Sequence, residues 1–319
     1  MNALFERIGT IGLVPVIQLD SPAKAPGLGR ALVRGGIPLV EVTFRTSAAE
    51  EAIHVLTAEV PELLVGAGTV LNLDQADRAV RAGARFLVSP SWVDEVVHYG
   101  LDSGVPVLPG VASPDGVARG LALGLEVLKF FPAGLSGGTA MLDAFAGPFG
   151  AARFVPTGGI DAGNLAGYAS RGNVLAVGGT WMVRPDLVEG EQWEAVERLC
   201  REAVAALHGF AFAHLGVNGQ DEGTSRAMAG LLERLFHLAP REGTSSIFAG
   251  DRMELTKAPG LGAHGHIAIR CNQVERAVAY LAGQDIAARP ETAKLERGRL
   301  KAIYLELDLG GFAVHLVKG

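Results

Sequence analysis

The chain has 319 residues, which is enough for two domains of ordinary size. Apolar residues make up 49% and charged residues 19% of it, a composition that is typical of a folded globular protein and excludes a disordered chain. The net charge is −6 and no run of lysine and arginine occurs, which argues against a nucleic-acid partner. Glu6, Arg7, Gly12 and Pro15 interrupt the N-terminal segment, so it fits neither a secretory signal nor a membrane span. We therefore expect a cytoplasmic protein without nucleic-acid or membrane partners.

Short apolar strands alternate with helical patterns up to about residue 182. The expected strands cover residues 13–19, 39–45, 63–69, 85–90, 106–111, 126–132, 153–159 and 174–182. The segments between them carry apolar residues at helical spacing and often end in glycine. Eight strand and helix pairs predict parallel strands closed into a (β/α)8 TIM barrel. The alternative is an open doubly wound sheet, which usually stops at five or six strands.

The pattern changes near residue 208, after the last expected barrel helix. A unit of one strand, one helix and several further strands then occurs twice, beginning with FAHLGV at residue 212 and HGHIAIRC at residue 264. In the second unit, one of the later strands is expected around residues 286–290. The net charge changes from −7 before residue 209 to +1 after it. We therefore expect a TIM barrel over residues 1–208 and a smaller α+β domain of two βαβββ units over residues 209–319.

One lysine stands inside an expected core strand. Residues 1–208 contain two lysines, Lys24 and Lys129, and the second lies within the apolar segment VLKFFP. Desolvation lowers the pKa of a lysine amine and makes it a better nucleophile toward a carbonyl group, which favours Schiff-base chemistry. The alternative is a lysine whose stem packs in the core while its ammonium group reaches a carboxylate.

Polar side chains also gather at the ends of the expected strands. Alternation along the second strand places Glu41, Thr43 and Arg45 on one face, which points into the barrel. This carboxylate and this guanidinium either pair with each other or act as a proton shuttle and as a clamp for a keto acid. Thr69 ends the third strand and Pro90 ends the fourth, at the edge where barrel enzymes keep their active sites.

Paired glycines follow the last two strands of the expected barrel. They are Gly158 and Gly159 after the seventh strand and Gly178 and Gly179 after the eighth. Glycines allow backbone amides to point at an anion, and barrels frequently bind phosphate in these two loops. The alternative is that the glycines merely permit tight turns.

Residues 10–185 resemble the 2-keto-3-deoxy-6-phosphogluconate (KDPG) aldolase family, class I aldolases that also cleave 4-hydroxy-2-oxoglutarate. The resemblance is carried, in order, by VPVI (14–17), EVTFRT (41–46), GAGTVLN (66–72), SP (89–90), PG (109–110), KFFPA (129–133), AGPF (146–149), PTGGI (156–160) and GGTW (178–181). It implies that Lys129 forms the Schiff base and that Glu41 transfers protons. It further implies that Arg45 and Thr69 hold the pyruvyl end of the substrate and that Pro90 and Phe131 line the pocket.

The same resemblance assigns the phosphate group to the two glycine loops, and the residues are Thr157, Gly158, Gly159, Gly178, Gly179 and Thr180. It implies a homotrimer that cleaves KDPG to pyruvate and glyceraldehyde 3-phosphate, or 4-hydroxy-2-oxoglutarate to pyruvate and glyoxylate, without a cofactor. The alternatives are a phosphosugar epimerase or isomerase, an aldolase for the galactonate epimer of KDPG, and a binding protein with an inactive site.

Residues 209–319 hold five of the eight histidines. The repeated unit, with HLGV (214–217), MEL (253–255), GHIAI (265–269) and GFAVHLV (311–317), resembles the glyoxalase and extradiol dioxygenase superfamily, also called vicinal oxygen chelate. That superfamily draws metal ligands from the first and last strand of each unit, so the resemblance implies a divalent metal held by His214, Glu254, His266 and His315. The alternatives are an accessory binding or assembly module, and histidines satisfied within the structure.

Overall fold

The computed structural model describes residues 2–296 and 298–319. Its residues divide into two compact units, 1–207 and 208–319. Within the described residues, none of the helices combines the length and the apolarity that crossing a membrane requires.

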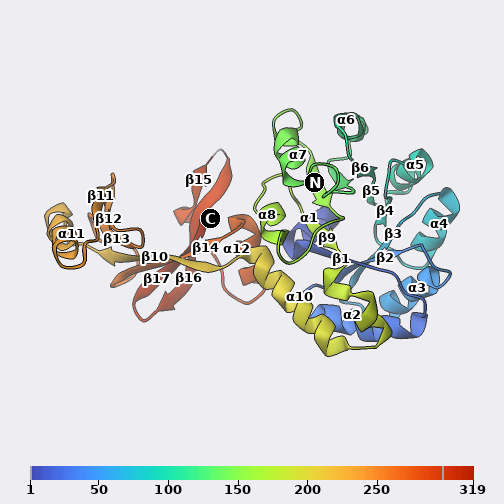
Figure 1. Ribbon diagram of the computed structural model, residues 1–319, viewed down its shortest axis with the longest axis horizontal. Helices are drawn as coiled ribbons and strands as arrows, with labels where there is room; N and C mark the ends of the chain where they lie inside the picture. The colour runs from blue at the N-terminus through green and yellow to red at the C-terminus, as the bar shows by residue number, and fades with distance from the viewer. Residues whose placement is uncertain (1, 297) are drawn as a thin grey trace. The chain divides into compact units, whose positions relative to one another are not determined.

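The first unit alternates strands and helices along the chain (Figure 1). Its strands are β1 (Leu13–Ile17), β2 (Leu39–Thr43), β3 (Leu64–Gly68), β4 (Leu87–Val88), β5 (Val107–Leu108), β6 (Gly110–Val111), β7 (Val127–Phe130), β8 (Arg153–Pro156) and β9 (Val177–Gly179). Its helices are α1 (Ala3–Ile11), η1 (Pro22–Lys24), α2 (Ala25–Arg34), α3 (Ala49–Glu59), α4 (Leu73–Arg81), α5 (Asp94–Ser103), α6 (Pro114–Ala122), α7 (Gly138–Ala146), α8 (Leu165–Ala169), η2 (Trp181–Val183), α9 (Pro185–Glu189) and α10 (Trp193–His208).

All the strands of this unit that pair do so in parallel. One sheet has the order β5-β4-β3-β2-β1-β9 and a second has the order β6-β7-β8. Pro109 alone separates β5 from β6, and isolated parallel bridges join Phe154 to Val174 and Thr157 to Gly178. Each of the eight expected strands contains an observed one, generally shorter, and the fifth is divided at Pro109. The unit is therefore an α/β structure with a parallel half-barrel sheet.

The strands of the first unit separate two apolar layers. Val40 and Val42 of β2 belong to the large core between the strands and the helices, whereas Leu39 belongs to a second core on the opposite face. Ile8 of α1 completes this second core, which also contains Val14 and other residues near the starts of the strands. The sequence interpretation did not include α1, although Asn2 caps its start and Gly12 its end.

The outer face of β7 is anchored by aromatic packing. Phe130 lies edge-on to Phe145 and Phe154, with ring centroids 6.1 and 6.4 Å apart. Each such pair contributes about 0.5–1.5 kcal/mol beyond the burial of its area. Because Phe130 faces outward, the alternation of β7 turns the preceding Lys129 toward the opposite face.

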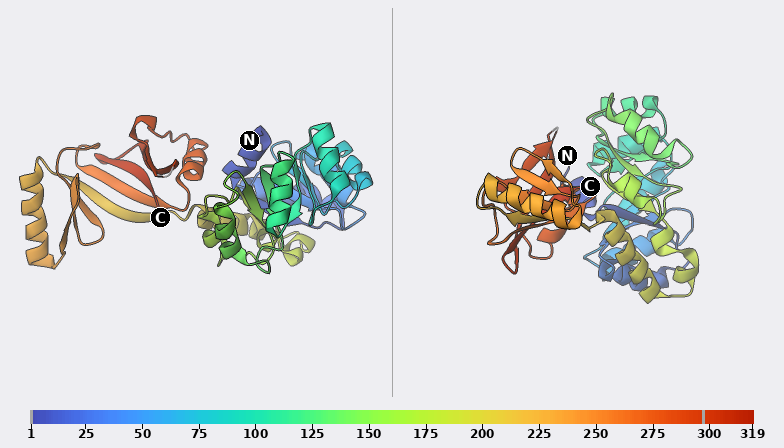
Figure 2. Two further views of the ribbon diagram at one scale, coloured as in Figure 1. Left: turned by 90° about the horizontal axis from the view of Figure 1, so that it is seen from above. Right: turned by 60° about the vertical axis from the view of Figure 1, so that its left-hand side comes forward.

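The second unit contains a continuous sheet (Figure 2). Its strand order is β11-β12-β13-β10-β14-β17-β16-β15. Its elements are β10 (Ala211–Asn218), α11 (Glu222–Phe236), β11 (Pro240–Glu242), β12 (Ser246–Ala249), β13 (Met253–Thr256), β14 (Gly265–Cys271), α12 (Val274–Ala282), η3 (Pro290–Thr292), β15 (Lys294–Glu296), β16 (Arg299–Leu309) and β17 (Phe312–Lys318). The strand expected around residues 286–290 is wrong: this segment has one isolated bridge, Ala288 to Leu305, and Pro290 begins η3. The short strands β11 and β15 were not expected.

Both helices of the second unit pack on one face of its sheet. Ile247 and Leu255 pack with Ala229 of α11, and Ile303 and Leu316 pack with α12. Side chains one position away in each strand point to the opposite face. That helix-free face therefore carries the polar residues Glu254, His266 and His315.

Candidate active site and histidine cluster

Lys129 and Glu41 form a buried ion pair. Lys129 Nζ donates a hydrogen bond of 3.1 Å to Glu41 Oε1, and the two side chains are 6% and 3% exposed. The ammonium group also lies 5.3 Å from the ring centroid of Phe131. The carboxylate that the structural alternative requires is thus present, and the partner of Glu41 is Lys129 rather than Arg45. An amine and a carboxylate in direct contact can exchange a proton through one hydrogen bond.

Both side chains open into a cavity of about 360 Å³. The cavity is lined by residues from the ends of several strands and the loops that follow them: Val16, Glu41, Arg45, Thr69, Pro90, Lys129, Phe131, Thr157, Gly158, Gly159, Ile160, Gly179 and Thr180. Of the aldolase site residues predicted from the sequence, Gly178 alone does not line this cavity. Val16 and Ile160 were not predicted, although both lie within the quoted motifs VPVI and PTGGI.

Glycines on neighbouring strands lie beside both members of the charged pair. Gly110 of β6 pairs in register with Lys129. A Cβ atom at Gly68 would lie 2.2 Å from Glu41 Oε1, closer than any real contact, so the carboxylate occupies the space that a side chain at this position would fill. The inward position of Glu41 therefore depends on the absence of a side chain at Gly68, whereas a side chain at Gly110 would meet the backbone of Pro90.

Two further polar residues face the cavity near its mouth. Arg45 is exposed there, and in the described part of the chain its guanidinium has no ion-pair partner. Thr69 has a φ of 56°, a left-handed conformation that is an outlier for a β-branched residue. Such strain persists where the surrounding structure imposes it, commonly at functional sites. An unpaired guanidinium beside the Lys129 and Glu41 pair is suited to a substrate carboxylate.

The loop after β8 supplies a second polar region of the cavity. Thr157 is 7% exposed, and its hydroxyl has no hydrogen-bond partner among the described residues. Gly158 and Gly159 follow with φ values of 94° and 74°, which residues with side chains adopt only under strain. Gly178 lies beneath the Thr157 hydroxyl, because a Cβ there would be 2.2 Å from Oγ1. The position of the Thr157 hydroxyl thus depends on the absence of a side chain at Gly178.

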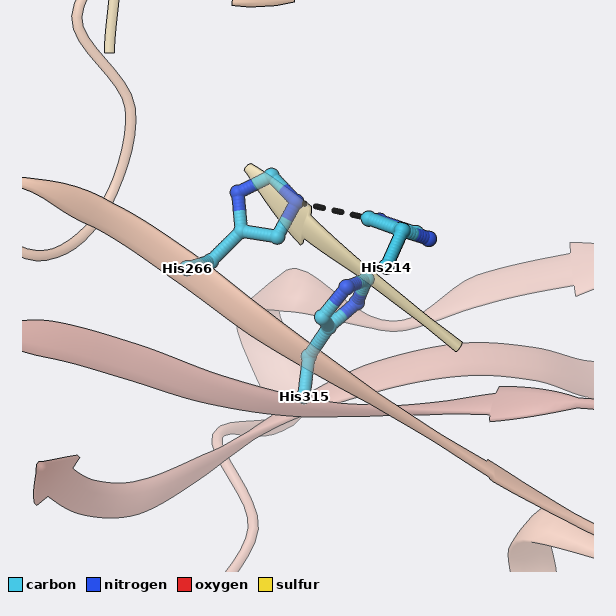
Figure 3. A group of neighbouring side chains, drawn as sticks. All are labelled: His214, His266 and His315. Carbon is cyan, nitrogen blue, oxygen red and sulfur yellow. Dashed lines mark hydrogen bonds between the residues drawn. The ribbon is translucent and has the colours of Figure 1, made fainter. Parts of the chain in front are cut away.

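The second unit brings three histidines and a glutamate together on the helix-free face of its sheet. Glu254 Oε2 lies 3.0 Å from His214 Nε2 and 3.2 Å from His266 Nε2, and these two nitrogens are 3.2 Å apart. The ligand atoms of His214, His266 and His315 all lie within 4.8 Å of one another (Figure 3). The structure therefore assembles all four residues that the sequence analysis singled out here.

Three neighbours that the sequence analysis did not identify shape this cluster. A Cβ at Gly216 would lie 2.1 Å from the His266 ring, so the ring lies over the bare backbone of β10. Tyr304 stacks on His315 with centroids 4.7 Å apart, and Phe248 lies edge-on to His214 at 5.5 Å. These contacts depend on the register between strands, which the sequence pattern does not contain.

Burial and neighbouring groups change the protonation of the cluster. Burial lowers the pKa of His315 to about 3, helped by the nearby His266 and His214. Burial raises the pKa of Glu254, but the hydrogen bonds with His214, His266 and Ser246 outweigh this and hold it below its usual range. His315 is 8% exposed, and its Nε2 atom has no hydrogen-bond partner within the part of the chain that the structure describes. A neutral imidazole with an unused nitrogen is in the form that binds metals.

Comparison with known proteins matches the first unit to one family. Residues 5–199 match the family model described as KDPG and KHG aldolase. The chain is 46% identical over 204 residues to the 2-dehydro-3-deoxy-phosphogluconate aldolase of Treponema pallidum, covering 64% of this chain and 97% of that relative.

Solved structures give the same result. A KDPG aldolase from Legionella pneumophila, with pyruvate captured as a covalent carbinolamine intermediate, has a TM-score of 0.61 and 38% identity, covering 62% of this chain and 97% of that one. The 2-keto-3-deoxy-6-phosphogluconate aldolase of Zymomonas mobilis, with 3-phosphoglycerate, has a TM-score of 0.59 and 38% identity, covering 63% of this chain and 95% of that one.

Proposed function

The chain belongs to the KDPG and KHG aldolase family, and from this premise we propose that it is a class I aldolase that cleaves KDPG to pyruvate and glyceraldehyde 3-phosphate. The observation that carries the proposal is the buried contact between Lys129 Nζ and Glu41 Oε1 at the cavity. The named relatives give no support to a phosphosugar epimerase or isomerase. Such an enzyme would also have no use for a buried lysine.

In the proposed mechanism, Glu41 first takes a proton from the ammonium group of Lys129, and the free amine attacks the C2 carbonyl carbon of the substrate. The C2 oxygen leaves as water with one proton from the attacking nitrogen and one from Glu41, and a protonated imine remains on Lys129. Glu41 then takes the proton of the C4 hydroxyl. The C3–C4 bond breaks, its electrons move into the imine, and glyceraldehyde 3-phosphate leaves. Protonation of the resulting enamine at C3 and hydrolysis of the imine release pyruvate and restore the lysine.

The remaining cavity residues would hold the two charged ends of the substrate. Arg45 and Thr69 would bind the pyruvyl carboxylate, beside the pocket walls formed by Pro90 and Phe131. The phosphate would lie at the other polar region, formed by Thr157, Gly158, Gly159, Gly179 and Thr180 with Gly178 beneath. The reaction needs no metal, because the protonated imine accepts the electrons.

Trapping with borohydride tests the proposal. Reduction in the presence of pyruvate should convert Lys129 to carboxyethyl-lysine, detected by peptide mass spectrometry, and Lys129→Ala should abolish both the adduct and cleavage. Lys24→Ala is the matched control, because Lys24 is the other lysine of the first unit and pairs with Glu189. Cleavage by Lys129→Ala would refute the mechanism. Relative rates on KDPG, its galactonate epimer and 4-hydroxy-2-oxoglutarate would identify the preferred substrate.

We also propose the finer architecture that the sequence predicted. Two observations support closure of the first unit into a (β/α)8 barrel. Only Pro109 separates β5 of one sheet from β6 of the other, and isolated parallel bridges join Phe154 to Val174 and Thr157 to Gly178. The order βαβββ, observed twice, supports a vicinal-oxygen-chelate-like domain after residue 208. A homotrimer and a cytoplasmic location stay predictions, the first of which light scattering in solution would test.

A second proposed function belongs to the histidine cluster, where His214, Glu254, His266 and His315 would hold a divalent metal. Three imidazoles and a carboxylate form a donor set that suits Zn2+ and related ions. The unpartnered Nε2 of His315 and the space left by Gly216 support this fit. A bound ion would supply a fixed positive charge and Lewis acidity at this face. Elemental analysis of the full chain, compared with a His214→Ala, His266→Ala double variant, tests it.

A further inference from the structure

We propose that the metal of the second unit is a structural zinc ion that joins its two βαβββ repeats, rather than a site for a substrate. Repeat 1 is residues 211–256 and repeat 2 is residues 265–318. This inference rests on the metal site proposed above. It assigns that site a structural role, whereas the proposal above states only that the four residues bind a metal.

The four candidate ligands are divided equally between the repeats. His214 and Glu254 come from β10 and β13 of repeat 1, whereas His266 and His315 come from β14 and β17 of repeat 2. In the described residues, the sheet passes from one repeat to the other only through the β10–β14 pair. The register of that pair shifts between Phe212 and His214, next to one of the ligands. An ion on these four side chains would bridge the junction where the sheet itself is irregular.

Repeat 1 has little apolar core of its own. Its buried apolar side chains within the described residues are Ala229, Ile247, Ala249 and Leu255, whereas the core cluster of repeat 2 alone contains seven. On α11, Leu235 and Phe236 are 55% and 64% exposed. Small folding units that bury so little apolar surface usually need a metal, a disulfide or a partner to be stable. The described cysteines, Cys200 and Cys271, are free.

The surroundings of the cluster are those of a closed site. Structural zinc sites use four protein ligands, whereas catalytic ones keep a position open for water or substrate. The side chains of His214, Glu254 and His266 are at most 18% exposed, and His315 is 8% exposed as a residue. The ligand atoms of His214, Glu254 and His266 lie 3.0–3.2 Å apart, close to the separation of about 3.4 Å that tetrahedral zinc imposes. The ligand atom of His315 lies within 4.8 Å of those of the other two histidines.

The rings around the cluster add to its enclosure. Tyr304 covers His315 face-on and Phe248 contacts the edge of His214, so two sides of the cluster are occupied by aromatic rings. These rings come from β16 of repeat 2 and β12 of repeat 1, respectively. The enclosure is therefore built from both repeats, as the ligand set is.

The test compares the full chain with and without zinc. Chelation should reduce amide hydrogen-exchange protection in α11, β12 and β13 by more than about 100-fold, and added Zn2+ should restore it. Aldol cleavage by the first unit should not change. His266→Ala should reproduce the loss of protection and of bound zinc. His264→Ala is the matched control, because His264 is exposed two residues away.

Cobalt substitution separates the structural role from metal binding itself. The Co2+ form should show the intense visible bands of tetrahedral coordination, and added azide should not alter them. Unchanged protection after zinc removal, or a spectrum that azide alters, would overturn the structural role while leaving the metal site intact. A full chain that binds neither Zn2+ nor Co2+ would refute both the role and the site.

Discussion

Lys129 Nζ and Glu41 Oε1 lie 3.1 Å apart although the two residues are separated by 88 positions in the chain. They reach the same cavity because β2 and β7 each turn one side chain inward, next to a glycine of a neighbouring strand. The contact is the shortest route for a proton between the proposed nucleophile and its partner. It therefore determines what substitution at either position should do.

Glu41→Gln should keep the fold and substrate binding but lower kcat by about 100-fold or more, since glutamine cannot transfer the proton. Steady-state cleavage of KDPG and the exchange of pyruvate methyl protons in deuterated water would both measure the loss. Glu59→Gln, on the surface of α3, is the control and should leave both rates unchanged. An effect confined to KM would show that Glu41 only orients Lys129.

Gly68→Ala should lower kcat by at least about 10-fold without unfolding the protein. The new methyl group would lie 2.2 Å from Glu41 Oε1, so the carboxylate must move away from Lys129, and small displacements of reacting groups cost large factors in rate. Gly147→Ala is the matched control because its Cβ would meet open space. Equal kinetics for the two variants would mean that Glu41 can work from another position.

A chain ending at Leu207 should fold and cleave KDPG at a rate close to that of the full chain. Every residue that lines the cavity lies before residue 181, and the relative from Treponema pallidum is covered to 97% by 204 aligned residues. Circular dichroism and steady-state kinetics check the prediction. A truncated protein that is folded yet inactive would show that residues beyond 207 contribute to the active site.

The burial of His208 predicts that the second unit becomes less stable at acid pH. Its ring is 3% exposed between Phe210 and Tyr280, and burial, with the charge of Arg276, lowers its pKa to about 4. The unfolded chain has a histidine pKa near 6.5, so it binds the proton more readily. His208 therefore makes its full contribution to the free energy of unfolding above about pH 6.5. This contribution, about 3 kcal/mol in total, is lost as the pH falls toward 4.

His208→Phe should remove this part of the pH dependence, because phenylalanine fills the stack and does not ionise. Hydrogen exchange in residues 272–283 at pH 7 and at pH 4.5 would measure the effect in the full chain. If the substituted and native proteins lose protection equally between these pH values, the ionisation of His208 does not contribute.

The sequence predicted the strands of the first unit well because their apolar runs are continuous. It predicted the ends poorly: the expected strand 174–182 is reduced to Val177–Gly179, since Trp181 begins a 3-10 helix. The two-residue β4 and the division of β5 from β6 are set by pairing with neighbours, which a single strand does not reveal. In the second unit, β11 is exposed and short, so it lacks an apolar signal.

The predicted site residues were recognisable from their chemistry, but not the residues that surround them. Lys129, Glu41 and the four members of the histidine cluster are charged or polar residues in apolar strands. Val16 and Ile160 are ordinary core residues until the register places them at the cavity. Gly216 and Tyr304 likewise acquire their importance only from the strands beside them.

The glycines beside the reactive groups also bear on how this chain could be redesigned. Lys129 has Gly110 as its lateral neighbour, Glu41 occupies the space above Gly68, and His266 lies over Gly216. Random mutagenesis that enlarges any of these glycines should impair activity or metal binding although every reactive residue is retained in the sequence. Libraries aimed at new substrates should therefore hold these three positions constant and vary the cavity wall at Val16 and Ile160 instead.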